Sequence, residues 1–117
     1  MRKRILLLLK GGLRFESMIR GYLQKEGYEV NTARSGNEVL QKLKRSPHFL
    51  LIVEQDTYEM DCLELFLNVQ DIQTEIPVLF LGSMNQQNKE EIVRLGGIYL
   101  EPPVETETLR KVIRRLP

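Results

Sequence analysis

The run from Phe49 to Val53 most limits how this chain folds, because five consecutive apolar residues end abruptly on the carboxylate of Glu54. A half-exposed strand would alternate apolar and polar residues, so this run predicts a strand that is buried on both faces of a sheet. Such strands belong to parallel sheets that helices cover on either side. The last residue of the strand emerges at the carboxyl edge of the sheet, where open α/β folds bind their ligands. Glu54 is therefore the first candidate for a functional residue.

Strand-like and helix-like patterns alternate five times along the chain. The apolar runs Ile5–Leu9 and Val78–Leu81 predict further central strands, whereas the alternating segment Tyr28–Ala33 and the short segment Ile98–Leu100 are typical of edge strands. Helices are indicated by apolar stripes that begin at Phe15, Val39, Leu63 and Leu109, and by a polar segment from about Gln86 to Arg94. This alternation predicts an α/β fold with a five-stranded parallel sheet and five helices. With the most apolar strands in the centre, the strand order is 2-1-3-4-5, a flavodoxin-like three-layer α/β/α sandwich that forms one domain over residues 1–117.

Composition and charge exclude several classes of protein. The 117 residues include 17 basic and 16 acidic ones, and the net charge of +1 argues against a nucleic-acid binder. The only cysteine, Cys62, excludes an internal disulfide and is typical of a cytoplasmic protein. The basic start followed by Ile5–Leu9 imitates a signal peptide, but Lys10 ends the apolar segment too early. A cytoplasmic domain with no membrane segment is expected.

Five segments carry a family resemblance by their order and spacing: Arg4–Leu9, Tyr22–Val30, Met60–Leu65, Ile76–Leu81 and Tyr99–Val104. Through them the chain resembles a response-regulator receiver (CheY-like) domain over essentially its whole length. The resemblance implies a signal-transduction module of two-component systems and phosphorelays, which works through protein–protein contacts and is not an enzyme. A protein partner, either a signalling protein or an effector domain, is therefore expected.

At the phosphorylation site the chain departs from the receiver pattern. Receivers bind Mg²⁺ through an acidic pair after the first strand and the acceptor aspartate after the third, and they carry a hydroxyl residue and a lysine after the next two strands. The corresponding positions here hold Lys10 and Gly11, then Glu54, then Gly82 with Ser83 as a shifted substitute, and finally Pro102. A lysine repels Mg²⁺, and a glutamate places its carboxylate about one methylene away from that of an aspartate. The resemblance therefore implies a degenerate site, a pseudo-receiver that has lost Mg²⁺-dependent aspartyl phosphorylation and has no catalytic residue, metal or cofactor.

Other roles for these residues stay open. The Lys10 ammonium could form an ion pair with Glu54 in place of the metal, or both side chains could point into solvent. The permanent charge of Glu54 could instead imitate a phosphorylated aspartate. In one alternative, Glu54 or Asp56 accepts a phosphoryl group in an unconventional site. In another, the turn Lys10-Gly11-Gly12 binds a small anionic ligand at the start of a helix.

Two regions are candidates for the face that contacts a partner. Tyr99 occupies the aromatic switch position of receivers, and the last helix carries Arg110, Lys111, Arg114 and Arg115 around its apolar stripe. These basic residues form either an ordinary exposed face, whose positive charges near the C-terminus are stabilised by the helix dipole, or a docking surface for an acidic partner. The face made by helix 4, strand 5 and helix 5 could also form a homodimer.

Three further residues have predicted structural roles. The Lys-Pro bond of receivers is usually cis, so the Pro102–Pro103 bond is expected to be cis, with Pro103 as the cis-proline. Cys62 is interpreted as a packing residue, because no plausible catalytic partner lies near it in the sequence. His48 follows Pro47 and is interpreted as a turn residue.

Overall fold

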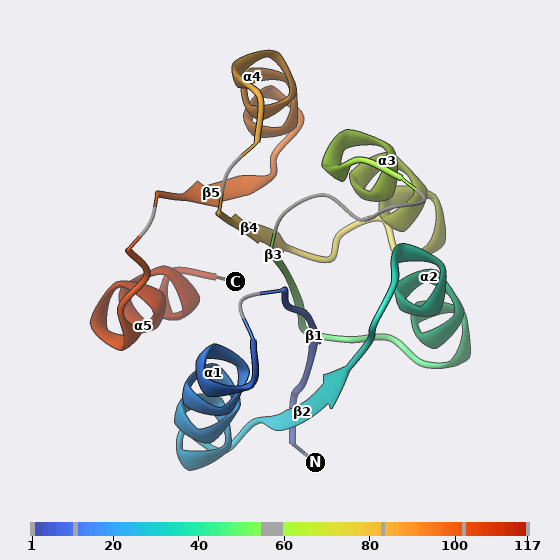
Figure 1. The fold of residues 1–117 in the computed structure, drawn as a ribbon. Coiled ribbons are helices and arrows are strands. Elements are labelled where there is room, and N and C mark those ends of the chain that lie inside the picture. Colours follow the sequence, from blue (N-terminus) through green and yellow to red (C-terminus); the bar gives the residue numbers. More distant parts are fainter. Residues whose placement is uncertain (1, 11, 55–59, 83, 102, 117) are drawn as a thin grey trace.

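The structure, a computed structural model, describes residues 2–10, 12–54, 60–82, 84–101 and 103–116. Its strands are β1 (Arg4–Leu8), β2 (Glu29–Thr32), β3 (Leu50–Glu54), β4 (Val78–Leu81) and β5 (Ile98–Leu100). They form one parallel sheet in the order β2-β1-β3-β4-β5. The helices that follow them are α1 (Leu13–Lys25), α2 (Gly36–Arg45), α3 (Cys62–Ile72), α4 (Gln86–Arg94) and α5 (Thr106–Arg114), as Figure 1 shows. The predicted fold class and strand order are confirmed.

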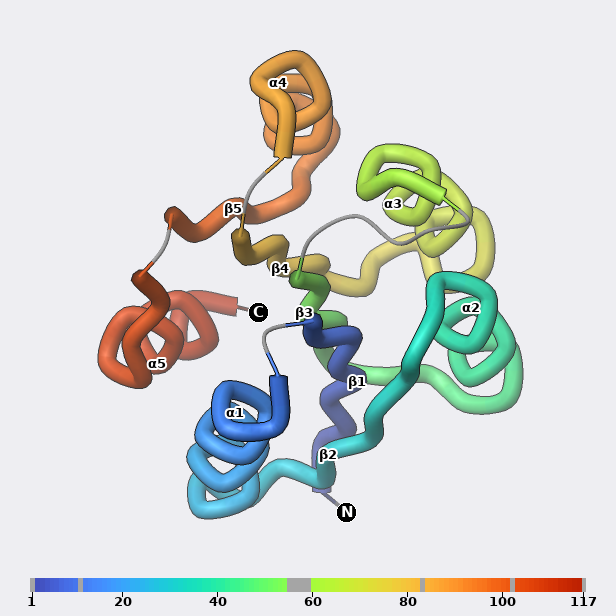
Figure 2. Tube along the Cα trace, in the orientation of Figure 1, coloured from blue at the N-terminus to red at the C-terminus, as the bar shows by residue number. Residues whose placement is uncertain are grey.

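The helices form two layers, with α1 and α5 on one face of the sheet and α2, α3 and α4 on the other (Figures 1 and 2). Successive side chains of β1 pack alternately against the two helical layers. Ile5 and Leu7 belong to the cluster that includes α1 and α5, whereas Leu6 and Leu8 belong to the cluster of α2, α3 and α4. All four are at most 1% exposed, which is why this strand has no polar residue between its ends. The edge strands β2 and β5 are mostly half-buried, as their sequences predicted.

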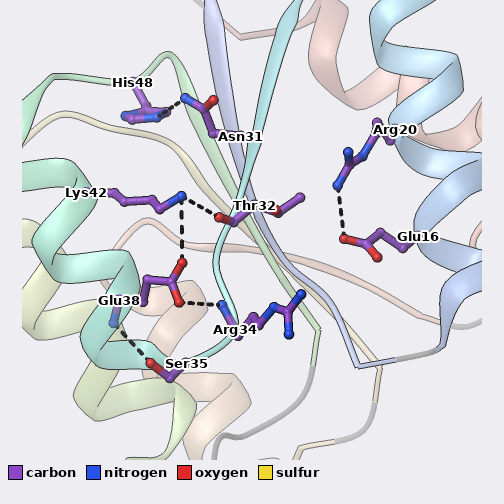
Figure 3. A network of polar contacts seen from close by, with 9 residues as sticks. All are labelled: Glu16, Arg20, Asn31, Thr32, Arg34, Ser35, Glu38, Lys42 and His48. Carbon is purple, nitrogen blue, oxygen red and sulfur yellow. Dashed lines mark hydrogen bonds and ion pairs between the residues drawn. The ribbon is translucent and has the colours of Figure 1, made fainter.

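Short polar side chains begin three of the helices. Ser35 Oγ accepts a hydrogen bond from the backbone N–H of Glu38 at the start of α2, over 3.1 Å (Figure 3). Asp61 accepts from the backbone N–H of Glu64 over 2.8 Å at α3, and Asn85 caps α4 in the same way. Each cap satisfies a backbone donor that has no partner inside its helix. Local sequence therefore determines where these helices start.

One long side chain connects α2 to the sheet. Lys42 Nζ donates to the carbonyl oxygen of Thr32 at the end of β2 over 2.7 Å and lies 3.6 Å from Glu38 Oε1 (Figure 3). On the other side of the sheet, Arg20 and Glu16 form an ion pair within α1, with 3.3 Å between nitrogen and oxygen. Over the described ranges, no helix combines the length and apolar character needed to cross a membrane.

Candidate functional site at the carboxyl edge of the sheet

The carboxyl ends of β1 and β3 lie next to each other in the sheet, since Leu8 is in register with Val53. Glu54, the last residue of β3, is half-buried there. Its carboxylate oxygen Oε1 accepts a hydrogen bond from the backbone N–H of Lys10 over 2.6 Å. Hydrogen bonds to an ionised acceptor are shorter and stronger than neutral ones. The backbone that follows β1 therefore holds the Glu54 carboxylate.

This contact differs in kind from the ion pair that the sequence suggested. The hypothesis paired Glu54 with the ammonium of Lys10, whereas the bond described here comes from the backbone N–H of the same residue. A backbone N–H is supplied by every residue except proline, so this bond does not depend on the lysine side chain. Pairing between the ammonium and Glu54 stays a prediction.

Among the described residues, the side chains at this edge do not form the set of oxygen ligands that a magnesium site needs. Mg²⁺ requires hard oxygen ligands in a near-octahedral arrangement. The resemblance predicts an acid at the position of the cation Lys10, and an oxygen of Glu54 accepts from a backbone amide. Outside residues 55–59 and the other gaps, no three His, Cys, Asp or Glu side chains come together in a group that could hold a metal ion.

The loop after β4 is connected to the edge strand β5 by a hydrogen bond. The hydroxyl of Tyr99, a half-buried residue of β5, donates to the carbonyl oxygen of Gly82. Gly82 has a φ of +90°, in the left-handed region that favours glycine. The Gly82 carbonyl therefore connects the end of β4 to the middle of β5.

A second set of contacts holds the Tyr99 ring against α4. Lys89 Nζ lies 4.4 Å from the centroid of the ring and 2.6 Å from Glu101 Oε1. The hydrogen bond to Glu101 raises the pKa of the Lys89 ammonium, so the cation over the ring stays charged at neutral pH. Tyr99 thus connects the loop after β4, the first half of α4 and the end of β5.

The chain is similar to bacterial regulatory proteins, although no family model matches it. It is 31% identical over 118 residues to the transcriptional regulatory protein CrdR of Helicobacter pylori, a match that covers 98% of this chain and 55% of CrdR. It is 33% identical over 93 residues to the transcriptional regulatory protein GlrR of Escherichia coli, which covers 78% of this chain and 21% of GlrR. The chain therefore corresponds to only part of each relative.

Solved structures agree with these sequence matches. The chemotaxis response regulator CheY4 of Vibrio cholerae has a TM-score of 0.84 and 26% identity over 100% of both chains. A response regulator receiver domain protein (CheY-like) from Methanospirillum hungatei shares the fold, with a TM-score of 0.87, 22% identity, and coverage of 97% of this chain and 92% of that one. Both comparisons support one family. In sequence and in fold the chain is similar to response-regulator receiver (CheY-like) domains.

The two parts of the predicted partner face lie on opposite sides of the sheet. Tyr99 packs against the apolar cluster that contains α3 and α4. The basic residues of α5 surround Leu109 and Ile113, which belong to the cluster on the other face. Lys111, Arg114 and Arg115 are exposed, whereas Arg110 is half-buried and forms an ion pair with Glu107. Tyr99 and these basic residues thus lie on opposite faces of the edge strand β5, so a partner that contacts both must extend around this edge.

Several residues of the predicted site lie outside the described residues. They are Gly11, Asp56, Ser83 and Pro102. The Pro102–Pro103 bond falls with them, although Pro103 itself is described and exposed. The roles predicted for these residues stay predictions. Cys62, in contrast, is 1% exposed in the cluster under α3, as expected for a packing residue.

Just before β3, away from the carboxyl edge of the sheet, lies a histidine network that the sequence did not reveal. His48 lies between α2 and β3 but is only 5% exposed, so it is a core residue as well as a connecting one. Its Nδ1 lies 3.0 Å from the carbonyl oxygen of Ser46, and its Nε2 lies 3.1 Å from Asn31 Nδ2 (Figure 3). The side chain of Gln73 bonds both the N–H and the carbonyl oxygen of His48, over 3.0 and 2.7 Å.

These contacts favour one tautomer of the neutral imidazole. A carbonyl oxygen only accepts, so Nδ1 carries the proton and Nε2 accepts from the Asn31 amide. Burial is the main reason why the pKa of His48 lies below its ordinary value. The Ser46 carbonyl opposes this shift, whereas Arg4 and Lys42 add to it. No sequence pattern marks this role, because the three partners come from separate elements.

Proposed function

We propose that this receiver domain is a pseudo-receiver, which transmits signals through protein contacts and not through Mg²⁺-dependent aspartyl phosphorylation. The hydrogen bond between the backbone N–H of Lys10 and Glu54 Oε1 carries the proposal. Through this bond a backbone N–H occupies the carboxylate of Glu54, the residue at the acceptor position. The residue that supplies the N–H is Lys10, a cation at a position where receivers have an acid.

The chemistry of phosphoryl transfer supports this proposal. Such transfer depends on placing the acceptor in line with the donor and on neutralising charge with metal ions. The longer side chain of Glu54 changes where the acceptor oxygen lies. The positive charge of Lys10 opposes the binding of a metal ion. The left-handed backbone at Gly82 favours glycine, so the missing hydroxyl cannot be restored there without strain.

The contacts of Tyr99 support the second half of the proposal, namely action through a protein partner. The ring is held by Lys89 and the hydroxyl by the Gly82 carbonyl oxygen. A surface that is ordered in this way is available to a partner at lower entropic cost. We infer that the partner is a signalling protein or an effector domain and that a homodimer could use the same α4–β5–α5 face.

The proposal also covers how the domain works in its setting. It is a signalling module of two-component type without enzymatic activity, located in the cytoplasm and formed by residues 1–117 as one domain. The regulators CrdR and GlrR extend well beyond the matched region, so the partner and output of any longer protein are part of the proposal.

An amide titration by nuclear magnetic resonance tests the proposal. Uniformly ¹⁵N-labelled protein is titrated first with millimolar MgCl₂ and then with beryllofluoride, which imitates a bound phosphoryl group. We expect no saturable shift at Lys10, Glu54 or Gly82. The matched positive control is the triple variant Lys10→Asp/Gly11→Asp/Glu54→Asp, which restores the three acidic positions implied by the family and should bind Mg²⁺.

Two outcomes separate the possibilities. Saturable shifts at Glu54 in the unmodified protein, spreading to Tyr99 with beryllofluoride, would show a working phosphorylation site and overturn the proposal. Shifts in the triple variant alone would show that these substitutions caused the loss.

A further inference from the structure

Three hydrogen bonds hold the backbone and the ring of His48 in place. Gln73 Oε1 accepts from the N–H of His48 over 3.0 Å, and Gln73 Nε2 donates to its carbonyl oxygen over 2.7 Å. The ring Nδ1 donates to the carbonyl oxygen of Ser46 over 3.0 Å. Nδ1 is a donor in this neutral tautomer and also in an imidazolium, so all three bonds are compatible with both charge states of the ring.

Of the bonds described around His48, the one to Asn31 alone depends on the charge of the ring (Figure 3). In the neutral ring Nε2 accepts from Asn31 Nδ2 over 3.1 Å, but in an imidazolium the same nitrogen is a donor. Two donors would then face each other. A carboxamide carries its donor and its acceptor on opposite sides of one bond, so half a turn of Asn31 replaces Nδ2 with Oδ1. Asn31 is half-buried on the edge strand β2, where the displaced Nδ2 can bind water.

A proton can reach the ring from solvent while the domain stays folded. The His48 side chain is only 5% exposed, but the residue lines two clefts with volumes of about 670 and 380 Å³. The larger cleft is bounded by residues 73–77 and the smaller one by residues 2–4. Protonation of this core residue therefore does not require the domain to unfold.

The groups around the ring act on its charge in both directions. Burial is the main cause that lowers the pKa of His48, and Arg4 of β1 and Lys42 of α2 add to it. The Ser46 carbonyl and Glu29 of β2 oppose this shift. Ser46 also lies at the C-terminal end of α2, where the helix dipole favours a cation. The two clefts contribute three further charged residues: Arg2, Lys3 and Glu75. The ring is thus neutral at pH 7 and gains its proton in mildly acidic solution.

We propose that His48 and Asn31 form a proton-operated switch, in which protonation of Nε2 makes the Asn31 carboxamide turn over and accept from the ring. The ring itself stays in place, because Ser46 and Gln73 hold it in both states. The proton comes from solvent and returns to it when the pH rises. Asn31 thereby exchanges the positions of its donor and its acceptor, so a proton on a core histidine changes the hydrogen-bonding pattern of an edge strand. This device goes beyond the proposed function and uses no residue of the carboxyl edge.

A pH titration of the ¹⁵N-labelled chain by nuclear magnetic resonance tests this inference. Two-bond ¹H–¹⁵N correlations of the imidazole give its tautomer and the midpoint of its titration. We expect a proton on Nδ1 above the midpoint, and a shift of the Asn31 side-chain NH₂ resonances with the same midpoint as the ring. The Nδ1–H resonance should persist below the midpoint. Asn37, an exposed asparagine of α2, is the internal control, and its NH₂ resonances should not follow this midpoint.

Substitutions of Asn31 distinguish a switch from a fixed donor. Asn31→Leu keeps a similar shape but removes the donor to the neutral ring and the acceptor for the charged ring. The bond to the charged ring is the stronger one, so a switch predicts that the midpoint falls by about 0.5–1 pH unit. A fixed donor stabilises only the neutral ring, so its removal would raise the midpoint. Asn31→Asp should raise the midpoint by about 1–3 pH units, whereas Asn37→Asp should leave it unchanged.

Four results would overturn the inference. The first is a set of Asn31 resonances that do not follow the titration of His48. The second is loss of the Nδ1–H resonance on protonation, which would mean that the ring leaves its site. The third is a higher midpoint in Asn31→Leu, as expected for a fixed donor. The fourth is unfolding of the unmodified chain before the ring titrates, because the switch requires a folded, protonated state.

Discussion

Replacing Gly97 with alanine should destabilise the domain strongly for a reason that can be measured in the structure. Gly97 is buried between α4 and β5. A Cβ built on it would lie 2.4 Å from Ile92 Cγ2, 3.1 Å from the carbonyl oxygen of Ile92 and 3.4 Å from Phe66 Cε1. The first distance is far below a normal carbon–carbon contact of about 3.5–4.0 Å. Something must therefore move when the methyl group is added.

The neighbours of Gly97 have little freedom to move. Ile92 is fully buried in α4, where a β-branched side chain has one strongly preferred rotamer. Its carbonyl oxygen already accepts from the N–H of Gly97 over 2.8 Å, so backbone displacement would break a bond. Overpacking of a core costs about 1–3 kcal/mol. We expect Gly97→Ala to lower the free energy of unfolding by about 2–3 kcal/mol, because both a rigid side chain and a backbone atom are in the way.

Urea unfolding followed by circular dichroism measures this effect. The midpoint should fall while the slope stays unchanged. The matched control is Gly21→Ala in the middle of α1, where an added Cβ meets no atom within 4 Å. That change should stabilise the domain by about 0.5–1 kcal/mol, since alanine is the better helix former. If Gly97→Ala changed stability by less than about 0.5 kcal/mol, the packing argument would be refuted. Ile92→Leu, which removes the Cγ2 branch, should reduce the cost of Gly97→Ala.

Three further predictions concern polar contacts. Because the pKa of His48 is lowered in the folded state, the stability it provides should be full above the ordinary pKa of about 6.5 and should decline as the pH falls below it. The free energy of unfolding of His48→Gln, measured above and below that pH, should not show this decline. If the variant and the unmodified protein had the same pH dependence, the prediction would be wrong. Tyr99→Phe should cost about 1 kcal/mol and shift the Gly82 amide resonance, through loss of one hydrogen bond; unchanged stability would argue against that bond. Glu54→Gln should lower stability by about 1 kcal/mol in the same assay, because a neutral oxygen accepts more weakly from the Lys10 N–H; equal stability would show that this bond contributes nothing.

The fold followed from local patterns in the sequence. The run from Phe49 to Val53 predicted a central strand, because a strand of five successive apolar residues is stable only when both of its faces are buried. β3 is buried as expected. The alternating segment from Tyr28 to Ala33 predicted an edge strand, which β2 is. Hydrophobic periodicity can be read locally, and the rules for parallel β-α connections leave few ways to order the strands.

The candidate site followed only in part. Glu54 was identified as the residue at the carboxyl edge, because strand direction alone places it there. One hypothesis paired it with the ammonium of Lys10 and the other left both side chains in solvent, whereas the bond described comes from the backbone N–H of Lys10. Which atom of Lys10 reaches Glu54 depends on the path of the backbone after β1, which residue types do not determine.

Long-range polar contacts were decided by the tertiary structure alone. His48 looked like a turn residue, yet Asn31, Ser46 and Gln73 satisfy its ring and backbone from three different segments. A cleft between α1 and α5 likewise joins Tyr22 to Arg114, which lie at opposite ends of the chain. The sequence by itself determined the elements and their order, because burial of apolar surface depends on short-range patterns. The contacts between polar atoms depend on how those elements pack, and only the folded chain brings them within a few ångströms.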